Sequence, residues 1–139
     1  MTTAESSAPK ISASFVLSGD DFDADACSNA IGLLSTDVWR QSRPELRDRP
    51  ELNNMNWSYG IEITTSFSTN DVVAKIVGEI WSRKEAVLEF AKLNNLSASL
   101  CCNITIHENR SVYELMPETM RQLADLNAEF LIDIFDYSQ

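Results

Sequence analysis

Four aspartates lie within six residues near the start of the chain, at positions 20, 21, 23 and 25 of the stretch SGDDFDADACSNAIGLL. Carboxylates at alternate positions are typical of an EF-hand calcium loop, where they ligate from the first, third and fifth places. That loop also needs a glycine at its sixth place and a bidentate glutamate at its twelfth. Here those places hold Ala26 and Gly32, and glycine has no side chain that could ligate. The pattern therefore predicts no calcium site.

The same aspartates suit the start of a helix. Asp23 precedes an amphipathic stretch that begins with Ala26 and Cys27, so its carboxylate can accept hydrogen bonds from first-turn N–H groups. Asp25 falls in the first turn, where the helix dipole favours a negative charge by about 0.3–1 kcal/mol. We therefore expect Asp23 to be a structural N-cap rather than a metal ligand.

No other set of residues matches a catalytic template. His107 is the only histidine, and Cys101 shares its face of a predicted strand, but the two would lie about 20 Å apart along that strand. A Cys–His pair needs hydrogen-bond contact, and zinc needs about four ligands of these types. The four glycines are scattered singly, so no phosphate-binding loop is predicted. We predict no catalytic residue, no bound metal and no cofactor.

The composition is that of an acidic, folded protein. Its 139 residues include 21 acids and 11 bases, and the net charge of −10 repels nucleic acids and anionic membranes. Three cysteines, two of them adjacent, form no disulfide framework, and the N-terminal residues contain no secretory signal. We expect a cytoplasmic protein that binds neither nucleic acid nor membrane. Residues 1–10 are expected to form a flexible tail, and residues 11–139 a single globular domain.

Alternating apolar and polar residues predict four strands, at 10–19, 57–64, 98–107 and 128–137. Each strand has one apolar face, which is expected to point inward. The residues on these inward faces are Ile11, Ala13, Phe15 and Leu17; Trp57, Tyr59, Ile61 and Ile63; Ala98, Leu100, Cys102, Ile104 and Ile106; and Phe130, Ile132 and Ile134.

Helical spacing of apolar residues predicts helices between these strands. The first follows Asp23, and the second covers residues 70–93, with a cap at Ser68 and a break near Ser82. The third begins at Pro117, and it is expected to end near Asn127 and to bury Met120, Leu123 and Ala124.

This order of elements predicts an α/β (α+β) fold. Because each strand has only one apolar face, we expect a two-layer sandwich: a mixed or antiparallel sheet of about four strands with helices on one face. Residues 40–56 lack periodicity and are predicted to form a long surface loop, with Trp39 and Trp57 as buried anchors at its two ends.

The other face of the sheet is expected to be open. It carries small polar side chains together with Leu131 and Phe135, apolar residues that an isolated soluble domain has little reason to expose. We predict that this face contacts protein, either a second copy of the chain or another partner. Alternatively, a chain terminus or the 40–56 loop covers it. The predicted partner-binding residues are Glu62, Cys101, Asn103, His107, Glu129, Leu131, Asp133 and Phe135.

Several segments together resemble a known family. They are SFVLSGDDFDADACSNAIGL, a following VWR, a proline-containing loop, NWSYGIEI, and a closing LADLNAEFLIDIFDY. Across roughly residues 12–137, this pattern resembles the uncharacterised, mainly bacterial family catalogued as domain of unknown function 4279. The positions that match its signature are Ser18, Gly19, Asp23, Gly32, Trp39, Arg40, Trp57, Asp133 and Tyr137.

Two hypotheses on function follow. The first is a non-catalytic binding protein, and similar small bacterial domains that lie beside toxin genes imply an immunity protein that neutralises a basic toxin. In that role the acidic charge would speed the encounter with the toxin. The second is a small-ligand protein or hydrolase-like enzyme using Glu62, His107, Glu129 and Asp133, provided that these groups converge on the open face and perturb one another's pKa.

Overall fold

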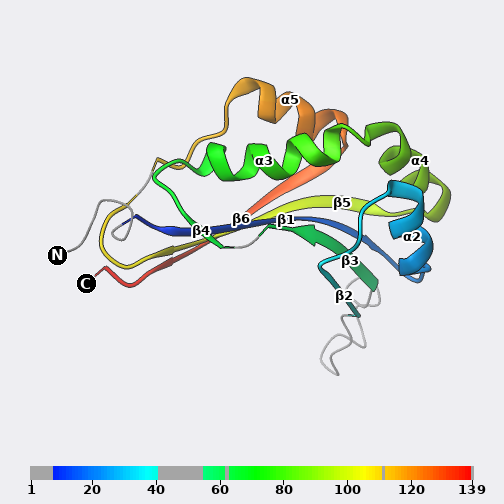
Figure 1. Ribbon diagram of the computed structural model, residues 1–139, viewed down its shortest axis with the longest axis horizontal. Coiled ribbons are helices and arrows are strands. Elements are labelled where there is room, and N and C mark those ends of the chain that lie inside the picture. Colours follow the sequence, from blue (N-terminus) through cyan, green and yellow to red (C-terminus); the bar gives the residue numbers. More distant parts are fainter. Residues whose placement is uncertain (1–7, 41–54, 62, 111, 139) are drawn as a thin grey trace.

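A computed structural model describes residues 8–40, 55–61, 63–110 and 112–138 (Figure 1). Its six strands form one sheet in the order β2-β3-β1-β5-β6, with β4 paired to β1. The strands are β1 (Lys10–Gly19), β2 (Asp37–Arg40), β3 (Met55–Gly60), β4 (Thr64–Thr65), β5 (Ser97–Ile106) and β6 (Ala128–Asp136). The helices are α2 (Ala24–Ile31), α3 (Thr69–Trp81), α4 (Lys84–Asn94) and α5 (Pro117–Asp125).

The predicted α+β architecture is confirmed. Helices α3, α4 and α5 lie on one side of the sheet, and the opposite side carries no helix of the described chain (Figure 1). Only β6 runs parallel to its neighbour, so the sheet is mixed. It is larger than predicted, because the short strands β2 and β4 add to it. Strands of four and two residues are too short to show a period in sequence.

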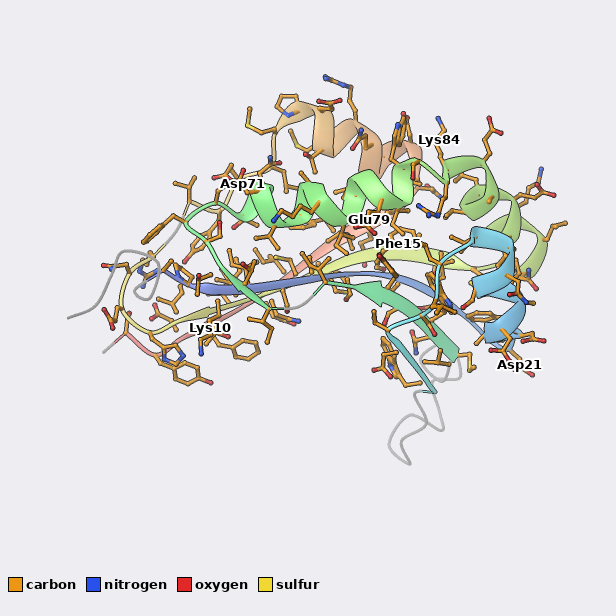
Figure 2. The ribbon with its side chains drawn as sticks, in the orientation of Figure 1. Lys10, Phe15, Asp21, Asp71, Glu79 and Lys84 are labelled. Carbon is orange, nitrogen blue, oxygen red and sulfur yellow. The ribbon has the colours of Figure 1, made fainter. Side chains whose placement is uncertain are left out.

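The core lies between the helices and the two central strands. On β1, the predicted inward residues Ile11, Ala13, Phe15 and Leu17 are all buried, and Figure 2 shows Phe15 on the helix side of the sheet. Lys10 lies on the opposite side in the same view. The predicted inward face of β5 is buried as well. β1 already begins at the last residue of the expected tail, and residues 1–7 lie outside the described chain.

The helix starts follow the capping chemistry of the sequence. The Asp23 carboxylate accepts hydrogen bonds from the N–H groups of Asp25 at 2.9 Å and Ala26 at 3.2 Å, which confirms it as the N-cap of α2. Ser68 caps α3 in the same way, by accepting from the N–H of Asp71. The predicted break near Ser82 separates α3 from α4. Among the described helices, none is both long and apolar enough to cross a membrane.

The predicted burial is wrong for two residues of α5 and for one residue after β3. Met120 and Ala124 of α5 are exposed, because the buried stripe runs through Thr119, Leu123 and Leu126 instead. Successive residues of a helix point about 100° apart, so a shift of one position turns a side chain out of the core. Ile63 is also exposed, because β3 ends at Gly60 rather than continuing to residue 64.

Candidate functional site

β6 forms one edge of the sheet and pairs only with β5. Their parallel register sets residues of the two strands side by side on the open face. The pairs are Ser99 with Glu129, Cys101 with Leu131, Asn103 with Asp133, and Thr105 with Phe135. Six of the predicted partner-binding residues thus come together in one surface, called the β5–β6 surface here: Cys101, Asn103, Glu129, Leu131, Asp133 and Phe135.

Apolar side chains are exposed on both faces of β6. On the open face, Leu131 and Phe135 are 46% and 47% exposed. Ile132 and Ile134 lie on the helix side as predicted, because they pair with the buried residues Cys102 and Ile104, but they are 40% and 45% exposed, so the expectation that they are buried is wrong. Helix α5 packs beside β6 but covers only its start, where Phe130 is partly buried against the core. β6 is apolar on both faces because Leu131, Ile132, Ile134 and Phe135 alternate between them. These side chains remain exposed because β6 lies at the edge of the sheet.

The outer edge of β6 carries free backbone groups. Successive residues of a strand direct their N–H and C=O groups alternately to its two sides. The N–H of Tyr137 donates to the Ile106 carbonyl at 2.7 Å, so the odd-numbered residues of this strand face β5. The even-numbered residues, including Ile132 and Ile134, therefore direct their N–H and C=O groups outward. No strand of the described chain pairs with them there.

The β5–β6 surface is negatively charged. Burial and, to a lesser extent, the charges of Asp133 and Glu129 raise the pKa of the Cys101 thiol above its ordinary value of 9.0. Asp136 is already paired with Arg110 at 2.6 Å, and hydrogen bonds from Ser138 contribute most to lowering its pKa. Within the described chain, neither Glu129 nor Asp133 has an ion-pair partner. This surface thus offers two unneutralised carboxylates between exposed apolar side chains.

Of the groups proposed for an enzymatic site, His107 and Glu129 lie far apart. His107 follows the end of β5 and stacks on Tyr137, with ring centroids 5.6 Å apart. Glu129 pairs with Ser99, eight residues before His107, which places the two about 26 Å apart along the sheet. Glu62 lies outside the described residues. Across the described ranges, no three His, Cys, Asp and Glu side chains gather in a way that could hold a metal ion.

The two tryptophans that flank residues 41–54 differ in environment. Trp57 is fully buried, and its indole N–H donates to Ser28 Oγ of α2 at 2.9 Å, so the prediction of a buried anchor is confirmed for it. For Trp39 that prediction is wrong, since 40% of its surface is exposed. It sits on the edge strand β2 opposite Asn56, facing the open side. Residues 41–54 of the predicted surface loop lie outside the described chain.

Some of the remaining family-signature positions have structural explanations. A Cβ on Gly19 would lie 2.4 Å from Leu96 Cδ2, so a larger residue at this position requires the Leu96 side chain to move. Gly32 ends α2 with a φ of 83°, a left-handed conformation that favours glycine. Arg40 is the last residue of β2 and pairs with Met55. Asp23 and Gly32 thus cap the two ends of α2, and Trp57 links that helix to the sheet through Ser28.

A shallow hollow of about 390 Å³ opens beside Trp39 on the same face of the sheet. Its lining includes Asp37, Ser58 and Gly60. Sequence reasoning missed this hollow because β2 is too short to show a pattern. It also missed the helix-side exposure of Ile132 and Ile134. One signal in the sequence indicates the exposure of Ile132 and Ile134. Apolar residues on both faces are typical of a central strand, but the charged residue Asp133 lies within this run and does not suit a buried strand.

Comparison with protein-family models matches residues 9–137 to a family described as domain of unknown function (DUF4279). No match was found among curated proteins or among solved structures.

Proposed function

We propose that this chain, which belongs to the DUF4279 family, works as a non-catalytic protein-binding domain. The observation that supports this role is the exposure of four large apolar side chains on one edge strand, Leu131, Ile132, Ile134 and Phe135. Soluble domains rarely leave a contiguous apolar patch uncovered unless it contacts a partner. The contact surface that we propose is the β5–β6 surface defined above, extended around the edge of β6 to Ile132 and Ile134.

The charge of this surface favours a basic partner. Glu129 and Asp133 alternate with Leu131 and Phe135, and the whole chain carries a net charge of −10. Complementary charge accelerates the encounter of two proteins, and it discriminates against acidic competitors. In its most specific form, the proposal is an immunity protein that neutralises a basic toxin in the cytoplasm. The free state of Cys27, Cys101 and Cys102 agrees with a reducing compartment.

Photo-cross-linking in the native host tests the protein-binding role. A photoreactive phenylalanine analogue replaces Phe135 in one variant and Leu93 in another. Leu93 is the matched control, because it is 76% exposed and apolar but lies on α4, away from the β5–β6 surface. We expect a discrete protein adduct at position 135 that is absent at position 93.

The identity of the adduct completes the test. A partner with excess lysine and arginine supports the proposal in full, and protection of cells from that partner by coexpression supports the immunity role. An acidic partner would contradict the electrostatic part of the proposal. Equal adducts at both positions, or none at position 135, would refute the protein-binding role at this surface.

A further inference from the structure

The outer edge of β6 has features that allow another strand to pair with it. Natural edge strands are usually kept short or protected by charged side chains, especially lysine, by proline or by a bulge. β6 runs for nine residues, Ala128–Asp136, and its sequence AEFLIDIFD contains no lysine, proline or glycine. Its charged residues, Glu129, Asp133 and Asp136, are all acidic, so they oppose pairing with an acidic strand but not with a basic one. Its register with β5 is continuous over all nine residues. The opposite edge of the sheet, β2, has only four residues.

The side chains of β6 specify what such a strand should carry. On the open face the order is Glu129, Leu131, Asp133 and Phe135, so acidic and apolar residues alternate at every second position. Residues opposite each other on paired strands interact, and opposite charges stabilise the pair whereas like charges destabilise it. A complementary strand therefore places lysine or arginine four residues apart, with an apolar residue midway between them.

A second copy of the chain does not fit this pattern. β6 contains no basic residue, so no register of two β6 strands gives Glu129 or Asp133 a cation. When the pair is centred on residue 133, the two copies of Asp133 face each other directly. When it is centred on residue 131, Glu129 of each copy faces Asp133 of the other. Two chains of charge −10 also repel each other at a distance.

We propose, on the basis of the protein-binding role above, that the partner docks by adding an extended strand to the outer edge of β6. The strand belongs to a basic protein and presents lysine or arginine to Glu129 and Asp133. Its backbone bonds to the outward N–H and C=O groups of Ile132 and Ile134. Strand addition combines backbone hydrogen bonds, which supply affinity, with alternate side chains, which supply specificity.

A synthetic peptide tests the recognition pattern directly. The nine-residue probe has lysine at its first, fifth and ninth positions, valine at its third and seventh, and threonine elsewhere. It reads the same in both directions, so it can pair with β6 in either orientation. One control replaces each lysine with glutamate, and another keeps the composition but groups the three lysines together. Fluorescence anisotropy should show binding of the first peptide at least about tenfold tighter than of either control.

Hydrogen exchange locates the bound peptide. The outward amides of Ile132 and Ile134 should exchange quickly in the free protein, because they have no partner at the edge. Peptide binding should protect both amides. The amides of Leu131 and Asp133 face β5, so their protection should change little. Protection that is absent at Ile132 and Ile134 in a saturated complex would overturn docking at this edge.

Two matched variants separate backbone pairing from loss of a side chain. Ile134→Pro removes an outward N–H, which an edge strand tolerates, and Ile134→Ala removes the same apolar contact but keeps the N–H. We expect Ile134→Pro to weaken peptide binding by about tenfold relative to Ile134→Ala, the loss that corresponds to one hydrogen bond. Equal binding by the two variants would contradict strand addition.

A charge reversal keeps the test decisive if Ile134→Pro fails to fold. The double variant Glu129→Lys and Asp133→Lys changes two exposed side chains. This variant should bind the lysine peptide more weakly than the wild type does, and it should bind the glutamate peptide more tightly. An unchanged preference would overturn the proposed pairing. Light scattering tests the competing occupant: a wild-type dimer that Ile134→Pro converts to a monomer would identify a second copy instead of a basic partner.

The cross-linking experiment distinguishes failure of this inference from failure of the proposed function. Chains with the photoreactive analogue at position 135 are combined with Ile134→Pro or Ile134→Ala. Loss of the adduct with proline but not with alanine supports strand addition. An adduct that persists in both means that the partner binds the face rather than the edge, so the protein-binding role stands and this inference falls. No adduct even without either substitution refutes both.

Discussion

The hydrogen bond between Trp57 and Ser28 should contribute measurably to stability, because it joins β3 to α2 inside the core. Trp57 is fully buried, and its indole N–H has Ser28 Oγ as its acceptor at 2.9 Å. Ser28→Ala leaves that N–H buried without an acceptor. A buried polar group that loses its partner costs about 1–3 kcal/mol, so the free energy of unfolding should fall by this amount.

A double-mutant cycle isolates the bond from the packing around it. Trp57→Phe removes the donor together with part of the ring, and the lost contacts should cost about 1–3 kcal/mol. In the Trp57→Phe background there is no indole N–H that could lose its acceptor. Ser28→Ala should then lower the free energy of unfolding by less than about 0.5 kcal/mol. The interaction energy of the cycle should therefore be about 1–2 kcal/mol.

Urea unfolding followed by far-UV circular dichroism measures all four proteins of the cycle. Asn29→Ala is the matched control, because Asn29 is an exposed neighbour of Ser28 on the same helix, and it should change stability by no more than about 0.5 kcal/mol. If Ser28→Ala costs the same with and without Trp57, or no more than Asn29→Ala, the hydrogen bond does not stabilise the fold and the reasoning is refuted.

Asp23→Ala should lower the free energy of unfolding by about 0.5–2 kcal/mol, and Asp23→Asn by less because an acceptor remains; equal losses in urea unfolding would argue against the cap. Replacing Trp39 with phenylalanine should reduce iodide quenching of tryptophan emission, since 40% of its surface is exposed whereas Trp57 is beyond the reach of iodide. Unchanged quenching would contradict that exposure. Burial raises the pKa of Cys27 from 9.0 to about 12, so the folded chain keeps a proton that the unfolded chain releases. The stabilisation is fully present below pH 9.0 and lost as the pH rises toward 12, so unfolding curves should show a smaller decline over this range for Cys27→Ala.

Much of the candidate surface was predictable because it depends on strand parity. Alternation alone predicts that Leu131, Asp133 and Phe135 lie on the open face, and β6 places them there beside Cys101 and Asn103. Alternation fixes which side chains share a face, since successive residues of a strand point in opposite directions. It does not fix which strands are neighbours, so the wide separation of His107 from Glu129 emerged only from the register of β5 and β6.

The sequence by itself determined the local features of this protein: the alternation of strands and helices, the apolar faces of β1 and β5, the caps at Asp23 and Ser68, and the break near Ser82. Each depends on interactions between residues close together in the chain. Tertiary structure decided what covers each apolar face. Ile132 and Ile134 have the same pattern as Leu100 and Cys102, yet they are exposed, because β6 lies at the edge of the sheet and β5 inside it. Periodicity makes a face apolar, but only neighbouring elements can remove it from water.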